Sequence, residues 1–459
     1  MHVLQKSNAV QSDLAHDAYF ENLFEKEFSR LQDGGHTYLD YTGGGIYSKS
    51  QLKAHFDLLN QNTLGNPHSV NPTSALATSF IEMSRQSVLD FFNAHDYECI
   101  FTLNASNAIK IVGESYPFSP NSILLLTADN HNSINGLRSF AENAEGKSLY
   151  SGLNDDLTLD RENLNQILHS YKNQDHKLFS FPAQSNASGV KHDLSWIKLA
   201  QNNGWDVLLD ASAYVPGNKL NLSIVQPDFV CLSFYKMFGY PTGIGCLLVL
   251  KSKFEKLQKK WFAGGTVKLA SVKACAHYLQ CNHERFEDGT LNYLSLPAIK
   301  TGLNFLQSVG MGRLQERIHD LQQYGVEMLK SFRHTSGAPI VEIYGPKDRS
   351  ICGGTITMCF QNSLGEKIHF RKIEKKAAEL GFSIRAGCFC NPGVDEYFHN
   401  LSADLLNDYF SNHNTGDYDH LLETTGMFRG AVRISVGIAS RRKDIDEFAK
   451  FVNSWKDKV

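Results

Sequence analysis

The chain has 459 residues, which is too many for one small core, so two domains are the natural expectation. Hydrophobic residues make up 42% and charged residues 20%, and the net charge of -3 gives no electrostatic reason to expect nucleic acid or a membrane as partner. Residues 1–17 lack a signal-peptide pattern, and no apolar run is long enough to span a bilayer. Nine cysteines spread along the chain are typical of a reducing compartment, so we expect a cytoplasmic protein.

An amphipathic helix is predicted over residues 18–31, where apolar residues recur at helical spacing. From about Ser79, helical stretches alternate with short apolar runs bounded by polar, Gly or Pro residues. Runs that are apolar on both faces are typical of strands in a mainly parallel sheet, and their alternation with helices predicts a doubly wound α/β large domain. The predicted strands are 122–127, 177–182, 206–210, 229–233 and 245–250.

The pattern changes near Gly310. Long amphipathic stretches there alternate with runs such as GTITMCF and AVRISVG, which predicts a smaller α+β domain. We therefore expect a large domain over 46–309 and a small domain over 310–459.

Polar residues follow two successive predicted strands. Asp210 ends the run DVLLD, and Lys236 follows FVCLS within SFYKMFGYPTGIG. Ligands collect at the carboxyl ends of such strands. A pyridoxal-phosphate site needs a lysine to form a Schiff base and an acid to keep the pyridine nitrogen protonated. Taken alone, each residue is more often a loop lysine or a capping aspartate. Their pairing, with Ser233 and Tyr235 around the lysine, favours the cofactor site.

Further polar residues stand at other strand ends. In TLNASNAIKIVG, small and hydroxyl residues lead into a helical pattern, and a helix N-terminus can bind a phosphate as well as carry a plain N-cap. His131 follows SILLLTADN and could stack on a pyridine ring and act as an acid or base. Asn186, in PAQSNASGV, could bond the cofactor or the substrate, although each is by default an ordinary loop residue.

These motifs resemble those of class V pyridoxal-phosphate enzymes, and they are most similar to the cysteine desulfurase domain of molybdenum cofactor sulfurases. The resemblance runs from about Tyr38 to Phe448. It implies the aminotransferase class V fold, with a mainly parallel seven-stranded sheet, and an N-terminal segment, residues 1–45, that packs with the small domain. The segments that carry it are YLDYTGGGIYS, NPHS, TLNASNAIK, DNHNSI, QSNASG, LLDAS, SFYKMFGYPTGIG, FAGGTV, RFEDGT, RAGCFCNPG and VRISVG.

The resemblance also implies roles for single residues. Lys236 holds the cofactor, Asp210 pairs with the pyridine nitrogen, and His131 stacks over the ring and takes part in catalysis. Arg433, in VRISVG, clamps the substrate carboxylate, for which a guanidinium offers two-pronged bonds. The other residues implied to bind the cofactor are Ala105, Ser106, Asn186, Ser233 and Tyr235, with Thr266 and Thr290 reaching the phosphate of the partner subunit in a homodimer. Asn186 also contacts the substrate in this interpretation.

The loop RAGCFCNPG indicates the reaction. In desulfurases a loop cysteine attacks the substrate sulfur and becomes a persulfide, which requires a thiolate within reach. Cys390 occupies that position, and Arg385 either lowers its thiol pKa or helps to bind the substrate. Cys388 forms a C-x-C pair with Cys390, but no second ligand pair follows, so no metal site is expected. The plain alternative for both cysteines is a pair of small buried apolar residues.

The chain departs from the family pattern in places. Ala213 stands where desulfurases carry Gln, or Lys in the molybdenum cofactor type, and the Cys that often follows CFCN is absent. The chain also stops near the end of the desulfurase-like part, so a complete molybdenum cofactor sulfurase is not expected. The polar stretch from Asp395 to Gly430 is long for a loop. It either covers the site or docks a sulfur acceptor, or it is a variable insertion with its own short helices.

The leading hypothesis is a cysteine desulfurase that takes L-cysteine or a related amino acid, releases alanine and passes sulfur through a Cys390 persulfide to an acceptor protein. A C–S lyase, an epimerase or an aminotransferase on the same fold is the alternative, because fold alone does not fix the reaction. A degenerate member that binds a partner or carries sulfur without catalysis is a third hypothesis. The intact set Lys236, Asp210, His131 and Arg433 argues against it.

Overall fold

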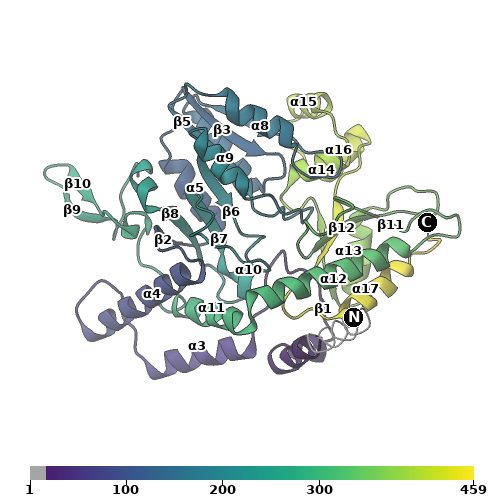
Figure 1. Cartoon of the computed structure of the whole chain (residues 1–459), viewed down its shortest axis with the longest axis horizontal. Helices are drawn as coiled ribbons and strands as arrows, with labels where there is room; N and C mark the ends of the chain where they lie inside the picture. The colour runs from purple at the N-terminus through teal and green to yellow at the C-terminus, as the bar shows by residue number, and fades with distance from the viewer. Residues whose placement is uncertain (1–16, 459) are drawn as a thin grey trace, which may run out of the picture.

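The centre of the molecule is a seven-stranded sheet with the strand order β2-β8-β7-β6-β5-β3-β4 (Figure 1). The computed structural model describes residues 17–458. All neighbouring strands from β4 to β7 pair in parallel, and β8 runs antiparallel to both of its neighbours. The predicted mainly parallel sheet is therefore confirmed. Its strands are β2 (Tyr97–Thr102), β3 (Ser122–Thr127), β4 (Lys147–Ser151), β5 (His176–Pro182), β6 (Asp206–Asp210), β7 (Phe229–Ser233) and β8 (Gly245–Leu250).

Both faces of this sheet are buried, which explains its continuous apolar runs. In β7, Val230 and Leu232 join one hydrophobic cluster, whereas Phe229 and Cys231 join the other. Successive strand residues point to opposite faces, so both faces need apolar side chains when helices cover both. The helices of this part are α3 (Lys49–Gln61), α4 (Pro72–Phe91), α5 (Ala105–Ser115), α6 (Asn132–Asn135), α7 (Leu137–Asn143), α8 (Arg161–Ser170), α9 (Ser195–Asn202), α10 (Phe234–Phe238) and α11 (Pro297–Val309), with 3-10 turns η1 (Lys251–Lys256) and η2 (His283–Phe286).

The C-terminal part contains a second, antiparallel sheet with the order β11-β12-β15-β14. The predicted smaller α+β part is thus present, and the predicted division at residue 309 falls between α11 and α12. The stretch 395–430 contains short helices of its own, which is what the alternative of a variable insertion predicts. The elements here are α12 (Met311–Ser331), β11 (Val341–Ile343), β12 (Thr355–Phe360), α13 (Phe370–Glu379), β13 (Phe382–Ser383), β14 (Arg385–Gly387), α14 (Pro392–Phe398), α15 (Ala403–Asn412), α16 (Tyr418–Thr425), β15 (Ala431–Ser435) and α17 (Arg442–Asn453).

The N-terminal segment lies against the C-terminal part. Residues 17–27 are helical and are followed by α2 (Arg30–Asp33) and β1 (Thr37–Tyr38), which pairs with β13. Phe20, Phe24 and Phe28 recur at every fourth position and are buried, so one helix face packs inward. The Arg441 guanidinium lies 3.6 Å from the centre of the Phe24 ring. Residues 1–16 of the predicted segment lie outside the described residues.

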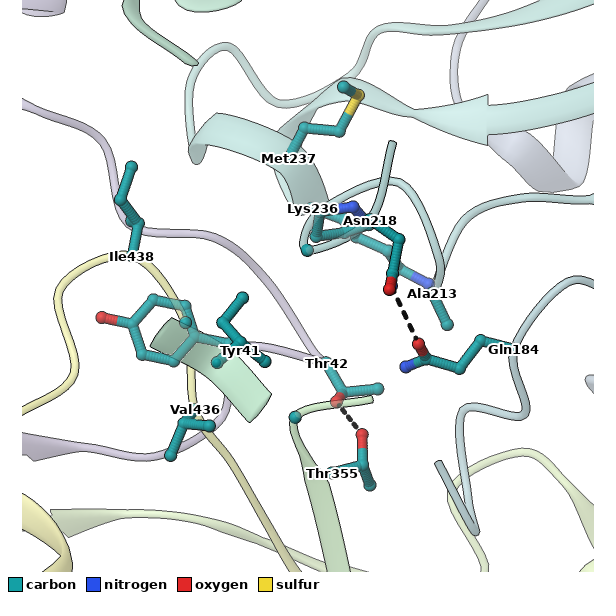
Figure 2. Close-up of a pocket in the computed structure, with 15 residues that line it drawn as sticks. Tyr41, Thr42, Gln184, Ala213, Asn218, Lys236, Met237, Thr355, Val436 and Ile438 are labelled. Carbon is teal, nitrogen blue, oxygen red and sulfur yellow. Dashed lines mark hydrogen bonds between the residues drawn. The ribbon is translucent and has the colours of Figure 1, made fainter. Parts of the chain in front are cut away.

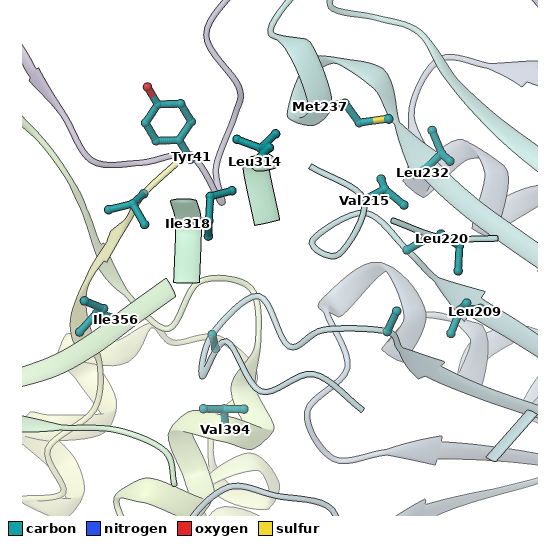
Figure 3. Packing of buried hydrophobic residues seen from close by; sticks show 14 of the residues in the cluster. Tyr41, Leu209, Val215, Leu220, Leu232, Met237, Leu314, Ile318, Ile356 and Val394 are labelled. Carbon is teal, nitrogen blue, oxygen red and sulfur yellow. The ribbon is translucent and has the colours of Figure 1, made fainter. Parts of the chain in front are cut away.

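One hydrophobic cluster connects the two parts of the molecule. Figure 3 shows Leu209 and Leu232 of the large sheet, Ile318 of α12 and Ile356 of β12 around a shared core. The hydrophobic packing next to the site is therefore continuous from one sheet to the other. None of the helices between residues 17 and 458 combines the length and apolar character that a membrane span requires.

Candidate active site

Lys236 lies at the carboxyl edge of the large sheet, in the short helix α10 that follows β7. It lines a cavity of about 190 Å³ that we call the site cavity. Gly239 ends α10 with φ of 77°, and a Cβ there would collide with Tyr47 N, so only glycine fits this turn. The cavity is lined by Asn104, Ala105, Ser106, Ile109, His131, Ser133, Pro182, Gln184, Asn186, Asp210, Ser212, Ala213, Ser233, Tyr235 and Lys236.

Asp210 ends β6 directly beside β7. The two strands are parallel, and Asp210 stands opposite Cys231, so the residues that follow both strands meet at one edge. Asp210 is buried, and its Oδ1 accepts a hydrogen bond of 2.9 Å from Ser212 N. Burial lowers the pKa of Lys236 below its ordinary value, whereas the Asp210 carboxylate opposes this shift. The lysine and aspartate predicted from strand ends therefore do share one cavity.

The N-terminus of α5 forms another wall of the site cavity. Ala105 N donates a hydrogen bond of 2.8 Å to Ser233 Oγ, and the hydroxyls of Ser106 and Ser133 are 2.6 Å apart. Asn104 Oδ1 caps the helix by accepting from Asn107 N at 2.9 Å. A helix N-terminus with two hydroxyls suits a phosphate group. The N-cap and the anion site expected from TLNASNAIK can thus coexist.

His131 precedes α6 and faces the same cavity. Its Nδ1 accepts a hydrogen bond of 3.1 Å from Ser133 N, so the proton of the neutral ring is on Nε2. Burial lowers the pKa of His131, Asp210 opposes this shift, and Lys236 adds to it. A ring that is neutral near pH 7 can stack flat on an aromatic cofactor and accept or donate a proton.

Arg433 and Arg385 share a carboxylate that sequence reasoning missed. Asp40 Oδ1 accepts from Arg433 Nη2 at 2.9 Å, and Asp40 Oδ2 accepts from Arg385 Nη2 at 2.6 Å. Arg433 Nη1 also donates to the carbonyl oxygen of the cavity residue Asn186 at 2.9 Å. Arg433 is almost fully buried, whereas half of the Arg385 side chain is exposed. Two cations and one anion leave one net positive charge, which matches a single substrate carboxylate.

The two loop cysteines differ in their surroundings. Cys390 is exposed, and Cys388 is buried, with its Sγ 3.2 Å from Asp395 Oδ2. Burial, and then the Asp395 carboxylate, raise the pKa of the Cys388 thiol, which makes it a poor nucleophile. Asn186 Nδ2 donates to Phe389 O at 2.8 Å, and Asn132 N donates to Cys390 O at 2.7 Å. The loop is therefore bonded to the rim of the site cavity on both sides of Cys390.

The structure does not bring Thr266 and Thr290 to the site cavity of their own chain. Thr266 is buried and bonds to Ala263 at 2.9 Å, whereas Thr290 is exposed and lines a separate cavity of about 290 Å³. Their predicted role through a partner subunit stays a prediction.

Gln184 lines the site cavity and is another residue that the sequence analysis overlooked. It lies beside Ala213, and both also line a smaller cavity of about 40 Å³ behind Lys236 (Figure 2). Asn218 Nδ2 donates to Gln184 Oε1 at 3.2 Å, which leaves the Gln184 amide nitrogen available as a donor. Gln184, which follows β5, therefore places an amide on the cavity wall that Ala213 also lines. The sequence did hold a signal for Gln184, because this residue belongs to the motif QSNASG and stands two positions before the predicted site residue Asn186.

The residues of the site cavity fit pyridoxal phosphate. Lys236 offers an amine, Asp210 a buried carboxylate and His131 a ring, while the α5 N-terminus offers hydroxyls to a phosphate. Among residues 17–458, no group of three or more His, Cys, Asp and Glu side chains is arranged to hold a metal ion.

Comparison with known proteins agrees with this site. The chain belongs to the class V aminotransferase family, because residues 37–448 match the family described as Aminotransferase class-V. Fold and site together define a pyridoxal-phosphate enzyme.

Individual relatives and solved structures are also similar to the chain. The chain is 34% identical to molybdenum cofactor sulfurases of Drosophila mojavensis, over 94% of this chain and 59% of the relative, and of Solanum lycopersicum, over 93% and 56%. It therefore spans little more than half the length of these relatives. The apo structure of a cysteine desulfurase from Thermococcus onnurineus NA1 has the same fold, with a TM-score of 0.79, 22% identity, and coverage of 96% of this chain and 98% of that one. The cystine C-S lyase C-DES, in a complex with cysteine persulfide, shares the fold at a TM-score of 0.71 and 15% identity, over 94% and 100%.

Proposed function

We propose that this protein is a cysteine desulfurase that converts L-cysteine to alanine and passes the sulfur through Cys390 to an acceptor protein. The observation that carries the proposal is the position of Cys390, an exposed thiol on a loop whose backbone is bonded to the rim of the site cavity. Similarity to molybdenum cofactor sulfurases supports it, because those relatives are sulfur-transferring proteins by name.

Residues in the site cavity and beside it divide the tasks of substrate handling. When bound, pyridoxal phosphate supplies an electron sink for the bonds at the substrate Cα. Arg433 binds the substrate carboxylate, and Asp210 holds a proton on the pyridine nitrogen. Because burial lowers the pKa of Lys236, its Nζ can move a proton at the substrate Cα near neutral pH.

The sulfur step balances without an external oxidant. The thiolate of Cys390 attacks the substrate sulfur, an S–S bond forms, and the C–S bond of cysteine breaks. The electron pair of the broken bond stays with the carbon fragment, which takes a proton and leaves as alanine. The thiol of the enzyme becomes a persulfide, and the outer sulfur then passes to a nucleophile on the acceptor.

The test is the substitution Cys390→Ala in the holoenzyme. Alanine formed from L-cysteine is expected to fall by at least about a hundredfold, because among residues 17–458 Cys390 is the exposed thiol on the loop bonded to the cavity rim. Cys281→Ala is the matched control, since Cys281 is also exposed but lies outside the site. If Cys390→Ala still turns over cysteine, and the product is pyruvate with ammonia and sulfide, the C–S lyase alternative replaces the desulfurase.

We also propose a homodimer. The hairpin β9 (Val267–Ser271) and β10 (Ala276–Leu279) projects from the large part, and Leu269, Val272 and Tyr278 on it are exposed (Figure 1). Exposed apolar side chains gathered on one projection are typical of an interaction surface. Sedimentation of wild type and Val272→Glu tests this, and an unchanged monomer mass in both proteins would contradict it.

The proposed location is the cytoplasm, since all nine cysteines are free thiols. Fractionation of cells that express the tagged chain tests the location, and recovery from an oxidising compartment would contradict it.

A further inference from the structure

We propose that Asn391 is a positioning residue that holds the Cys390 loop, residues 388–391, against the site cavity. The proposal rests on the proposed role of Cys390 in accepting sulfur. Asn391 is fully buried although its side chain is polar. The large majority of buried polar side-chain groups are hydrogen-bonded, so the partners of Asn391 indicate what it holds together.

The Asn391 side chain joins three segments of the chain. Its Nδ2 donates to Asn186 Oδ1 at 2.9 Å and to Asp129 O at 2.7 Å. Its Oδ1 accepts from Val394 N at 3.3 Å and so caps α14. One amide thus connects the loop after β3, the loop after β5 and the start of α14. We call the bonds of Asn391 Nδ2 the latch.

The surroundings of the latch make it a firm support. The Asp129 carboxylate is fully buried and bonds to His192 Nε2 at 2.7 Å. His192 therefore also holds the loop after β3 in place. Gly393 packs so closely on this loop that a Cβ would collide with the carbonyl oxygen of Ala128. The start of α14 and the loop after β3 therefore meet without intervening space.

The latch also holds an unusual backbone. Phe389 and Cys390 have φ of 57° and 53°, a left-handed conformation that residues other than glycine rarely adopt. Two such residues in succession need external bonds to stay in place. Asn186 Nδ2 and Asn132 N bond to the carbonyl oxygens of these two residues at 2.8 and 2.7 Å. Asn391 orients Asn186 for this purpose, because Asn186 accepts through Oδ1 while it donates through Nδ2.

The consequence is a defined position for the Cys390 thiol. With the latch closed, the Cys390 backbone is held at its bond to Asn132 N, while the side chain stays exposed to an acceptor protein. Without it, the loop is free to leave the cavity rim. The Arg433 bonds to Asp40 and to the backbone carbonyl of Asn186 do not involve the Asn391 side chain, so the guanidinium that binds the substrate carboxylate keeps its partners when the latch is lost. We therefore expect loss of the latch to lower kcat and to leave KM nearly unchanged.

The experiment compares Asn391→Asp with wild type as holoenzymes. Aspartate keeps an oxygen that caps α14 but has no N–H to donate to Asn186 or Asp129. We expect kcat for alanine formation to fall at least about tenfold and KM to change less than about twofold. Hydrogen–deuterium exchange of the peptide that contains residues 388–392 should become at least about tenfold faster.

Two further variants make the result decisive. Asn391→Ser keeps a capping oxygen without adding a buried charge, and it should give the same pattern if Asn391→Asp fails to fold. Ser402→Ala removes the side-chain cap of the nearby helix α15 and should leave kcat and loop exchange unchanged. Unchanged loop exchange in both Asn391 variants, or a rise in KM at constant kcat, overturns the proposal. Hydrogen–deuterium exchange is measured without substrate, so its result does not depend on the reaction that the enzyme catalyses. The proposed function fails by a different result, which is alanine formation that survives in Cys390→Ala.

Discussion

Acidification is expected to destabilise the folded protein through His399. This residue is the C-cap that follows α14, and its side chain is almost completely buried. Lys367 Nζ lies 3.0 Å from its Nδ1, and Tyr344 Oη lies 3.1 Å from its Nε2. Because an ammonium group only donates, Nδ1 must be an acceptor, and the neutral ring carries its proton on Nε2. Burial, assisted by Lys367 and opposed by Asp395, lowers the pKa of His399 to about 4.

The magnitude follows from linkage. A histidine in the unfolded chain has a pKa of about 6.5. On acidification, the unfolded state therefore binds a proton at His399 before the folded state does. The contribution of His399 is therefore fully present above about pH 6.5 and is lost as the pH falls toward 4. The gap between these two pKa values corresponds to about 3 kcal/mol in the free energy of unfolding.

Urea unfolding of wild type and His399→Gln at about pH 7.5 and about pH 4.5 measures this contribution. The wild type is expected to lose about 2 to 3 kcal/mol more than the variant across this interval. Other titrating groups are common to both proteins and cancel in the difference. Free energies of unfolding that fall in parallel with pH would refute the reasoning, since they would show that His399 does not stay neutral in the folded state.

Three further substitutions test separate parts of the structure. Arg85→Ala leaves Glu287 buried without its partner at 2.7 Å, so a loss of about 3 to 5 kcal/mol is expected in urea unfolding, and a loss below about 1 kcal/mol contradicts it. Phe24→Ala opens a cavity in the core and should cost about 3 to 5 kcal/mol by the same measurement, and a loss below about 1 kcal/mol would show that the N-terminal helix contributes little. Asp40→Ala removes the carboxylate that orients Arg433, so KM for cysteine should rise about tenfold with kcat within about twofold, and an unchanged KM contradicts that role.

The sequence by itself determined the central sheet and the core of the site. Strands β3, β6, β7 and β8 have the predicted bounds, because strands buried on both faces must be apolar at nearly every position. Asp210 and Lys236 could be paired from the sequence for a related reason, since parallel strands place their carboxyl ends at one edge. The two edge strands, β2 and β4, were not among the predicted strands. In β4 the reason is that the strand is half exposed and lacks a continuous apolar run.

Only the tertiary structure decided how the site is completed. Asp40 meets Arg433 although 393 residues separate them, and Asn391 meets Asn186 across 205 residues. Such contacts leave no local pattern, because neither hydrophobic periodicity nor strand order specifies which polar side chains meet between two sheets. Gln184, which stands beside Ala213 in the folded chain, is a further example. The sequence therefore predicted groups that the folded chain brings into one cavity, and the packing of the two sheets against each other decided which side chains hold those groups in position.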